Sequence, residues 1–107
     1  MKNLTKTILS VALLVAVGSV SASADVAKGQ KLYLKKLKSA CGFNGGIMAA
    51  KHSMSEWKHL YEDKKLAQEL KHICPKAKES SLKEKFMPHY FDFFNEYASD
   101  SGNVPSC

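Results

Sequence analysis

The chain has 107 residues, of which 45% are hydrophobic, and a formal net charge of +6 at pH 7. Its positive charge comes from lysine alone, because the sequence contains no arginine. Nucleic-acid and phosphate sites usually rely on the planar, bidentate guanidinium group, so we expect no nucleic-acid partner. A solvated basic surface is the simplest interpretation of the charge, and steering toward an acidic protein or an anionic membrane surface is the functional alternative.

The first 24 residues have the three parts of a secretory signal peptide. Two lysines make a basic start, an apolar run follows from 8 to 20, and Ala22 and Ala24 occupy the A-x-A positions of a cleavage site. The apolar run is shorter than the roughly 20 residues that a membrane-spanning helix needs. We therefore expect export, with residues 25–107 as one mature domain that has no stable membrane insertion. A domain of this size is near the lower limit for an unassisted core, so a disulfide or a cofactor would help it.

Helical spacing of apolar residues dominates the mature chain, and no strand-like alternation of useful length occurs. The first expected helix covers residues 26–39, where Tyr33, Leu34 and Leu37 recur at helical spacing. Gly29 lies inside this helix, where glycine is costly. We interpret it as a position where another backbone packs close. Three glycines between 42 and 46 then end the helix and force a loop.

The middle of the chain predicts two short helices after a helical turn at 47–51. Ser53 and Glu56 fit a capping box at the start of the first of them. The apolar face shifts between the two, which predicts a break at residues 62–65. The second helix should stop at Cys74, because a residue followed by proline resists helical geometry.

The last part of the chain predicts a polar stretch and then an aromatic helix. Residues 76–85 are rich in lysine and are expected to form a linker or a frayed helix. The final helix opens near Pro88, a good first-turn residue, and continues to Ala98 with a dense aromatic stripe. The sequence therefore predicts an all-α fold, a bundle of three to five short helices.

Three cysteines stand at positions 41, 74 and 107. In an oxidising compartment two of them should pair, and the third is left for a ligand, a partner or a free thiol. We favour a disulfide between Cys74 and Cys107, because it would fix the polar tail at 99–106. A bond between Cys41 and Cys74 is the main alternative.

The stretch Gly29-Gln30-Lys31-Leu32-Tyr33 resembles the G-x-x-L-Y pattern in the N-terminal helix of class I cytochrome c. In that family a C-terminal aromatic helix packs across the N-terminal one. The similarity in layout covers most of the mature chain, but it is specific only between residues 29 and 46. It implies a small cytochrome-c-like fold, a haem c cofactor and a role in respiratory electron transfer in a bacterial periplasm. It also implies a redox partner protein or an oxidase complex as the partner.

The sequence departs from that family at the haem-attachment motif C-x-x-C-H-G. With Cys41 as the first cysteine, Asn44 stands at the second cysteine and Gly45 at the histidine. With Cys41 as the second cysteine, Lys38 stands at the first and Gly42 at the histidine. Either register keeps one thioether cysteine and lacks the usual iron ligand.

If haem is bound, another residue must ligate the iron. The resemblance then makes Cys41 the covalent anchor, His52 the iron ligand and Met87 its distal partner, with Met54 and His59 as alternatives. Four aromatic residues are expected to line the apolar pocket: Tyr33, Trp57, Phe91 and Phe94.

Two interpretations without haem remain open. Sulfur and imidazole groups close in sequence suit copper, although scattered core and polar residues are the simpler explanation for them: Cys41, Met48, His52, Met54 and His59. The other interpretation is a haem-free binding or assembly protein of the periplasm that is stabilised by a disulfide. We expect no enzymatic activity, because no nucleophile elbow, phosphate loop or HExxH motif occurs.

Overall fold

The computed structural model describes residues 26–105, and all regular structure in this range is helical. The predicted all-α fold is therefore confirmed. The signal peptide predicted at residues 1–24 and the third cysteine, Cys107, lie outside the described residues. Between residues 26 and 105, no helix combines the length and the apolar character needed to cross a bilayer.

The first helical stretch runs from residue 26 to residue 41. It contains a π-helical turn, η1 (Tyr33–Leu37), followed by α2 (Lys38–Cys41). Both end residues of η1 are fully buried, so the wider turn points Tyr33 and Leu37 into the core. The stretch ends at Gly42, whose left-handed φ of 81° is the usual glycine stop for a helix.

Side-chain caps define the next two helices. The Asn44 side chain accepts a hydrogen bond from the amide of Ile47 and so begins α3 (Gly45–Ala49). Ser53 begins α4 (Met54–Glu62) through the predicted capping box. Its hydroxyl accepts from the Glu56 amide at 3.2 Å, and the Glu56 carboxylate accepts from the Ser53 amide at 2.9 Å.

The rest of the chain follows the predicted stops and starts. Residues 63–65 separate α4 from α5 (Leu66–Ile73), and α5 ends before the Cys74-Pro75 pair. The lysine-rich stretch holds two single 3₁₀ turns, η2 (Glu79–Ser81) and η3 (Glu84–Phe86). The last helix, α6 (Met87–Glu96), has Pro88 in its first turn.

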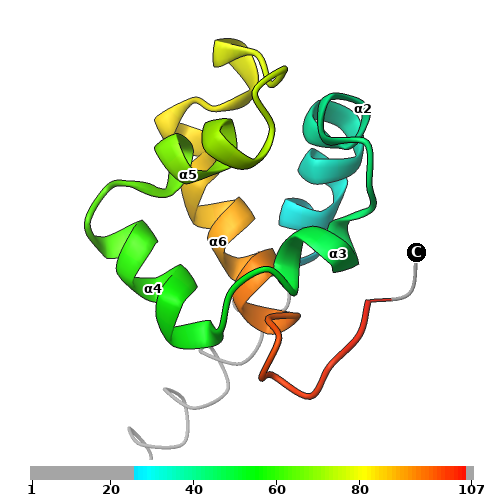
Figure 1. Ribbon diagram of the computed structural model, residues 1–107, viewed down its shortest axis with the longest axis vertical. Coiled ribbons are helices and arrows are strands. Elements are labelled where there is room, and N and C mark those ends of the chain that lie inside the picture. Colours follow the sequence, from blue (N-terminus) through cyan, green and yellow to red (C-terminus); the bar gives the residue numbers. More distant parts are fainter. Residues whose placement is uncertain (1–25, 106–107) are drawn as a thin grey trace, which may run out of the picture.

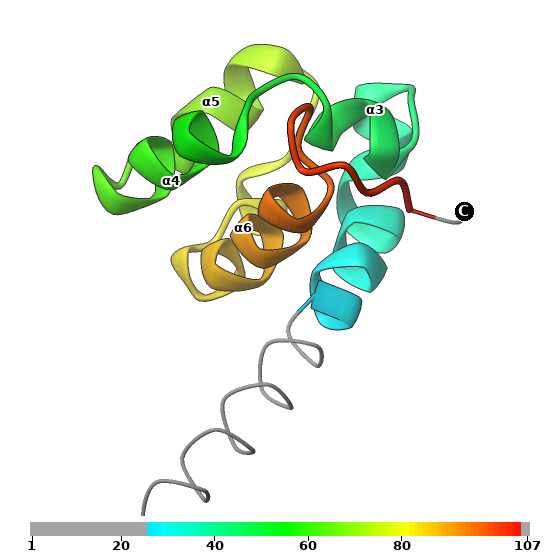
Figure 2. The same cartoon turned by 90° about the horizontal axis from the view of Figure 1, so that it is seen from below.

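Helix α6 lies in the middle of the described fold. Figure 1 shows it between the pair α4 and α5 on one side and the first helical stretch on the other. In the perpendicular view of Figure 2, α4 and α5 cover one face of α6, and α3 lies beside them. Contacts of α6 with α3, α4 and α5 agree with both views. The aromatic stripe of α6 therefore faces several elements at once.

Fully buried aromatic side chains form the centre of the core. Trp57 stacks on Phe94 with a centroid distance of 4.7 Å, and Tyr90 stacks on the same Phe94 at 6.1 Å. Their polar tips have partners, because the Trp57 indole N–H donates to the Ala49 carbonyl at 2.9 Å. The Tyr90 hydroxyl likewise donates to a carbonyl, that of Ser81, at 2.9 Å. Burial raises the pKa of Tyr90, since its charged form would be poorly solvated.

Gly29 is the point where the first helical stretch meets α6. A Cβ atom at this position would overlap the backbone carbonyl of His89 and come within 2.8 Å of the Phe93 Cβ. Backbone atoms cannot move aside as a flexible side chain can. The interpretation of Gly29 as a site of close backbone approach is therefore confirmed.

We predict that Gly29→Ala destabilises the fold by about 1–3 kcal/mol, despite the better helix propensity of alanine, because it overpacks this crossing. Chemical denaturation followed by circular dichroism measures the change. Lys28→Ala, on an exposed position of the same helix, is the control and should change the stability by less than about 0.5 kcal/mol. Equal or higher stability of Gly29→Ala would contradict the close contact.

Candidate functional site

The disulfide joins Cys41 to Cys74, with a Cα–Cα distance of 4.8 Å. The favoured pairing of Cys74 with Cys107 is therefore wrong, and the alternative is the bond that forms. The physical reason is tertiary: α2 ends at Cys41, Cys74 directly follows α5, and packing brings these two ends together. Spacing along the chain carries no information about that approach.

The same bond removes Cys41 as a free thiol. A thioether to haem and a disulfide both need the Cys41 sulfur, so one excludes the other. Cys74 is 1% exposed, which places its half of the bond within the core. Cys41 thus acts as a crosslink between the end of the first helical stretch and the end of α5.

His52 lies in the connection between α3 and α4 with both ring nitrogens engaged. Its Nδ1 is 3.2 Å from Oε1 of Glu56, and its Nε2 is 2.7 Å from Oε2 of Glu69. The ring also meets the Trp57 indole edge-on at 4.7 Å. Each nitrogen that could bind iron therefore already faces a carboxylate oxygen.

Met87 lies elsewhere, at the first residue of α6. It is 6% exposed and lines a hollow of about 490 Å³ with Leu66 and Leu82. His52 borders a different hollow, of about 360 Å³, together with His59. The structure does not bring the three predicted ligands together: Cys41 is in the disulfide, His52 is between two carboxylates, and Met87 is in its own hollow.

Three of the four predicted pocket aromatics form core instead of lining an opening. Tyr33, Trp57 and Phe94 are each 0% exposed, and Phe94 contacts both of the others. The fourth, Phe91, stacks on Tyr61 at 4.7 Å in a partly exposed position. Side chains thus fill the interior that was expected to hold a flat macrocycle. The residues present, as the structure places them, do not fit a haem.

The residues considered for copper also lie apart. Met48 is fully buried in α3, whereas Met54 is 39% exposed at the start of α4. Cys41 is crosslinked, and His52 is engaged by its two carboxylates. Neither Cys41 nor His52 therefore offers a free ligand atom in this arrangement.

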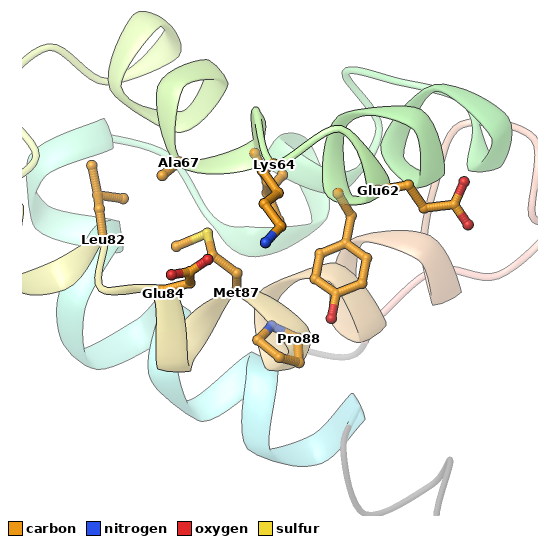
Figure 3. Close-up of a pocket in the computed structure, with 9 residues that line it drawn as sticks. Glu62, Lys64, Ala67, Leu82, Glu84, Met87 and Pro88 are labelled. Carbon is orange, nitrogen blue, oxygen red and sulfur yellow. The ribbon is translucent and has the colours of Figure 1, made fainter.

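The hollow at Met87 was missed in the sequence. Its lining is apolar at Leu66, Ala67, Leu82, Met87 and Pro88, and charged at Glu62, Lys64 and Glu84 (Figure 3). Lys64 is one of these and has a left-handed φ of 59°, which is uncommon for any residue but glycine. In the sequence, Lys64 belonged only to the predicted break between two helices. The apolar part of the hollow suits an apolar group of a ligand or of a partner side chain.

A basic surface covers the first helical stretch. Residues 26–51 contain six lysines and no acidic residue, whereas the acidic residues of the described chain all follow position 55. The Phe86 ring, at the end of η3, lies under two lysines: the Lys36 Nζ is 5.1 Å and the Lys85 Nζ 5.4 Å from its centroid. One lysine of the first helical stretch and one lysine of η3 therefore lie over the same ring. We define the basic surface by five exposed residues: Lys31, Lys35, Lys36, Lys38 and Lys85.

Comparisons with known proteins add nothing to the geometry described above. No family model matches the chain, and neither the curated proteins nor the solved structures contain a match. The disulfide, the filled core and the distribution of charge are therefore the features from which a function can be inferred.

We predict that Cys41→Ser and Cys74→Ser each lower the free energy of unfolding by about 3–4 kcal/mol, because the disulfide closes a separation of 33 residues. Thermal denaturation without reductant measures the loss, and peptide mapping without reduction identifies the bond. Cys107→Ser is the matched control and should leave the stability nearly unchanged. A large loss in Cys107→Ser with little change in Cys41→Ser would instead support the tail pairing.

Proposed function

We propose that this protein is an exported, haem-free binding or assembly protein of respiratory electron transfer, with a cytochrome-c-like fold that a disulfide stabilises. The proposal keeps the resemblance between residues 29 and 46 and the predicted periplasmic location. It sets aside the electron-carrier version, in which haem c would be held by Cys41, His52 and Met87. Binding, not catalysis, is the proposed activity.

The disulfide between Cys41 and Cys74 is the observation that carries the proposal. It uses the one sulfur available at the position of the family's attachment motif. Small domains of exported proteins often depend on such a crosslink, because their cores are too small to supply enough stability alone. A disulfide thus offers the stabilisation that a covalent cofactor would otherwise give.

The packing of the interior supports the same proposal. A protein that binds haem keeps a flat apolar cavity open for it, but here the central space is taken by indole and phenyl rings in mutual contact. Opening a cavity of that size would expose buried aromatic surface at a cost of several kcal/mol. The filled core therefore supports a haem-free protein.

The basic surface supports a partner with the opposite charge. Its lysines are exposed, and residues 26–51, which contribute four of the five, contain no acidic side chain. Such a surface attracts an acidic protein over long range and speeds the encounter. A redox partner protein or an oxidase complex with an acidic docking face is the proposed partner.

The absence of covalent haem is the first prediction of this proposal. Protein made with its leader, in cells that carry a haem-attachment system, should show no Soret band. The intact mass should equal that of the processed polypeptide, lighter by the two hydrogens lost when one disulfide forms. Absorption spectroscopy and mass spectrometry test this, with a cytochrome c expressed in the same cells as the positive control. A Soret band that survives acid–acetone extraction would contradict it.

Docking through the basic surface is the second prediction. Lys35→Glu with Lys38→Glu should weaken association with the detergent-solubilised oxidase complex of the source cells by about tenfold at low salt, because it reverses two of the five charges of the basic surface. Surface plasmon resonance at increasing ionic strength measures the effect, which should shrink as salt screens it.

The matched control for docking is Lys58→Glu with Lys65→Glu. It makes the same change in net charge on exposed positions away from the basic surface. The control should keep most of the binding. Equal losses in both variants would mean that only the net charge matters, and would contradict a defined docking surface.

A further inference from the structure

His52 makes two contacts that one neutral imidazole cannot both satisfy. Its Nδ1 faces Oε1 of Glu56 at 3.2 Å, and its Nε2 faces Oε2 of Glu69 at 2.7 Å. An ionised carboxylate only accepts hydrogen bonds, and a neutral imidazole has a single N–H to donate. Both contacts are hydrogen bonds only when His52 carries two ring protons and a positive charge.

The two carboxylates belong to different parts of the fold. Glu56 is in the first turn of α4, and Glu69 is on α5, so the ring bridges two helices. The backbone of His52 is also a junction, because its carbonyl accepts from the amide of Ser99 in the C-terminal tail at 3.1 Å. His52 therefore contacts α4, α5 and the C-terminal tail, and a change in its position would affect all three.

We propose that His52 is a proton-dependent clasp that closes on Glu56 and Glu69 when the ring is charged and opens on one side when it is neutral. The inference goes beyond the proposed function, since it requires neither a cofactor nor a partner. It assigns a role to a histidine that the resemblance had made an iron ligand.

Glu56 is the side on which the clasp opens. Its side chain is 61% exposed, against 23% for that of Glu69, and its contact is the longer of the two. The same Glu56 Oε1 atom also accepts from the Ser53 amide in the capping box. When His52 loses a proton, the Nδ1 lone pair faces this oxygen and repels it. Opening the clasp therefore weakens the start of α4.

Charged groups surround His52, and Glu56 is the one whose pKa they change. The hydrogen bond from the Ser53 amide, followed by that from His52, lowers the pKa of Glu56, so this carboxylate stays charged into the acid range. The clasp is therefore complete while the ring carries both protons and is lost as the pH rises. Other charged groups near the site are His59, Asp63 and Lys65, which border the same hollow, and Lys51 and Asp100 on adjacent segments.

Trp57 provides a direct readout. It is the only tryptophan of the chain, and its ring meets the His52 ring at 4.7 Å. A charged imidazole against an indole quenches its fluorescence by accepting an excited electron. We expect Trp57 emission to fall as the ring gains its second proton on acidification from about pH 8 to about pH 5.5. His52→Gln should abolish this change, and His72→Gln, on an exposed position of α5, should keep it.

Stability against pH tests the clasp itself. Chemical denaturation of the full mature chain at about pH 5.5 and about pH 8 should give a folding equilibrium constant roughly threefold to tenfold lower at the higher pH, relative to the same ratio for His52→Gln. Glu56→Gln keeps the oxygen that caps α4 but removes the charge, so it should lose most of this dependence.

Two results would overturn the proposal. One is a Trp57 fluorescence titration that persists unchanged in His52→Gln. The other is a loss of stability in His52→Gln that is equal at both pH values, which would make the contacts an ordinary structural bridge. The His72→Gln control excludes a general effect of removing one histidine.

Discussion

The aromatic face of α6 is the constraint on which the rest of the structure depends. Phe94 contacts Trp57 of α4, Tyr33 of the first helical stretch and Tyr90 of its own helix. Large rings bury much apolar surface and have few rotamers, so they fix the elements around them. The close crossing at Gly29 and the capped start of α4 both serve to bring rings into this contact. The position of the disulfide follows from where the helices then end.

The positions of those helix ends decide that Cys41 pairs with Cys74, and the proposed function depends on this pair. Packing on α6 brings the end of α2 and the residue after α5 within bonding range, and the crosslink forms there. The cysteine that the cytochrome-c-like interpretation makes a haem anchor thus crosslinks two helix ends. Four of the five lysines of the basic surface lie on the first helical stretch, which this crosslink ties to the end of α5. Stability and proposed binding are in this way connected through the same part of the fold.

Local chemistry explains what could be predicted from the sequence. Helix starts and stops depend on residues next to one another, so the capping box of Ser53, the stop before Pro75 and the first turn at Pro88 were all found where expected. The close backbone approach at Gly29 could be predicted too, because glycine destabilises a helix interior and its presence there indicates that a side chain would not fit. Charge segregation is also visible in the sequence, since lysines fill the first stretch and acids follow later.

Long-range approach decided what the sequence left open. The choice of Cys41 over Cys107 as the partner of Cys74 depends on which helix ends meet, and spacing carries no such information. The contact of His52 with Glu69 joins residues from two helices and converts a candidate iron ligand into a bridge. The sequence by itself determined the all-α class, the helix limits and the positions of charge, because these are local. Only the tertiary structure decided which sulfurs, nitrogens and rings face one another, because those contacts form when separate helices pack.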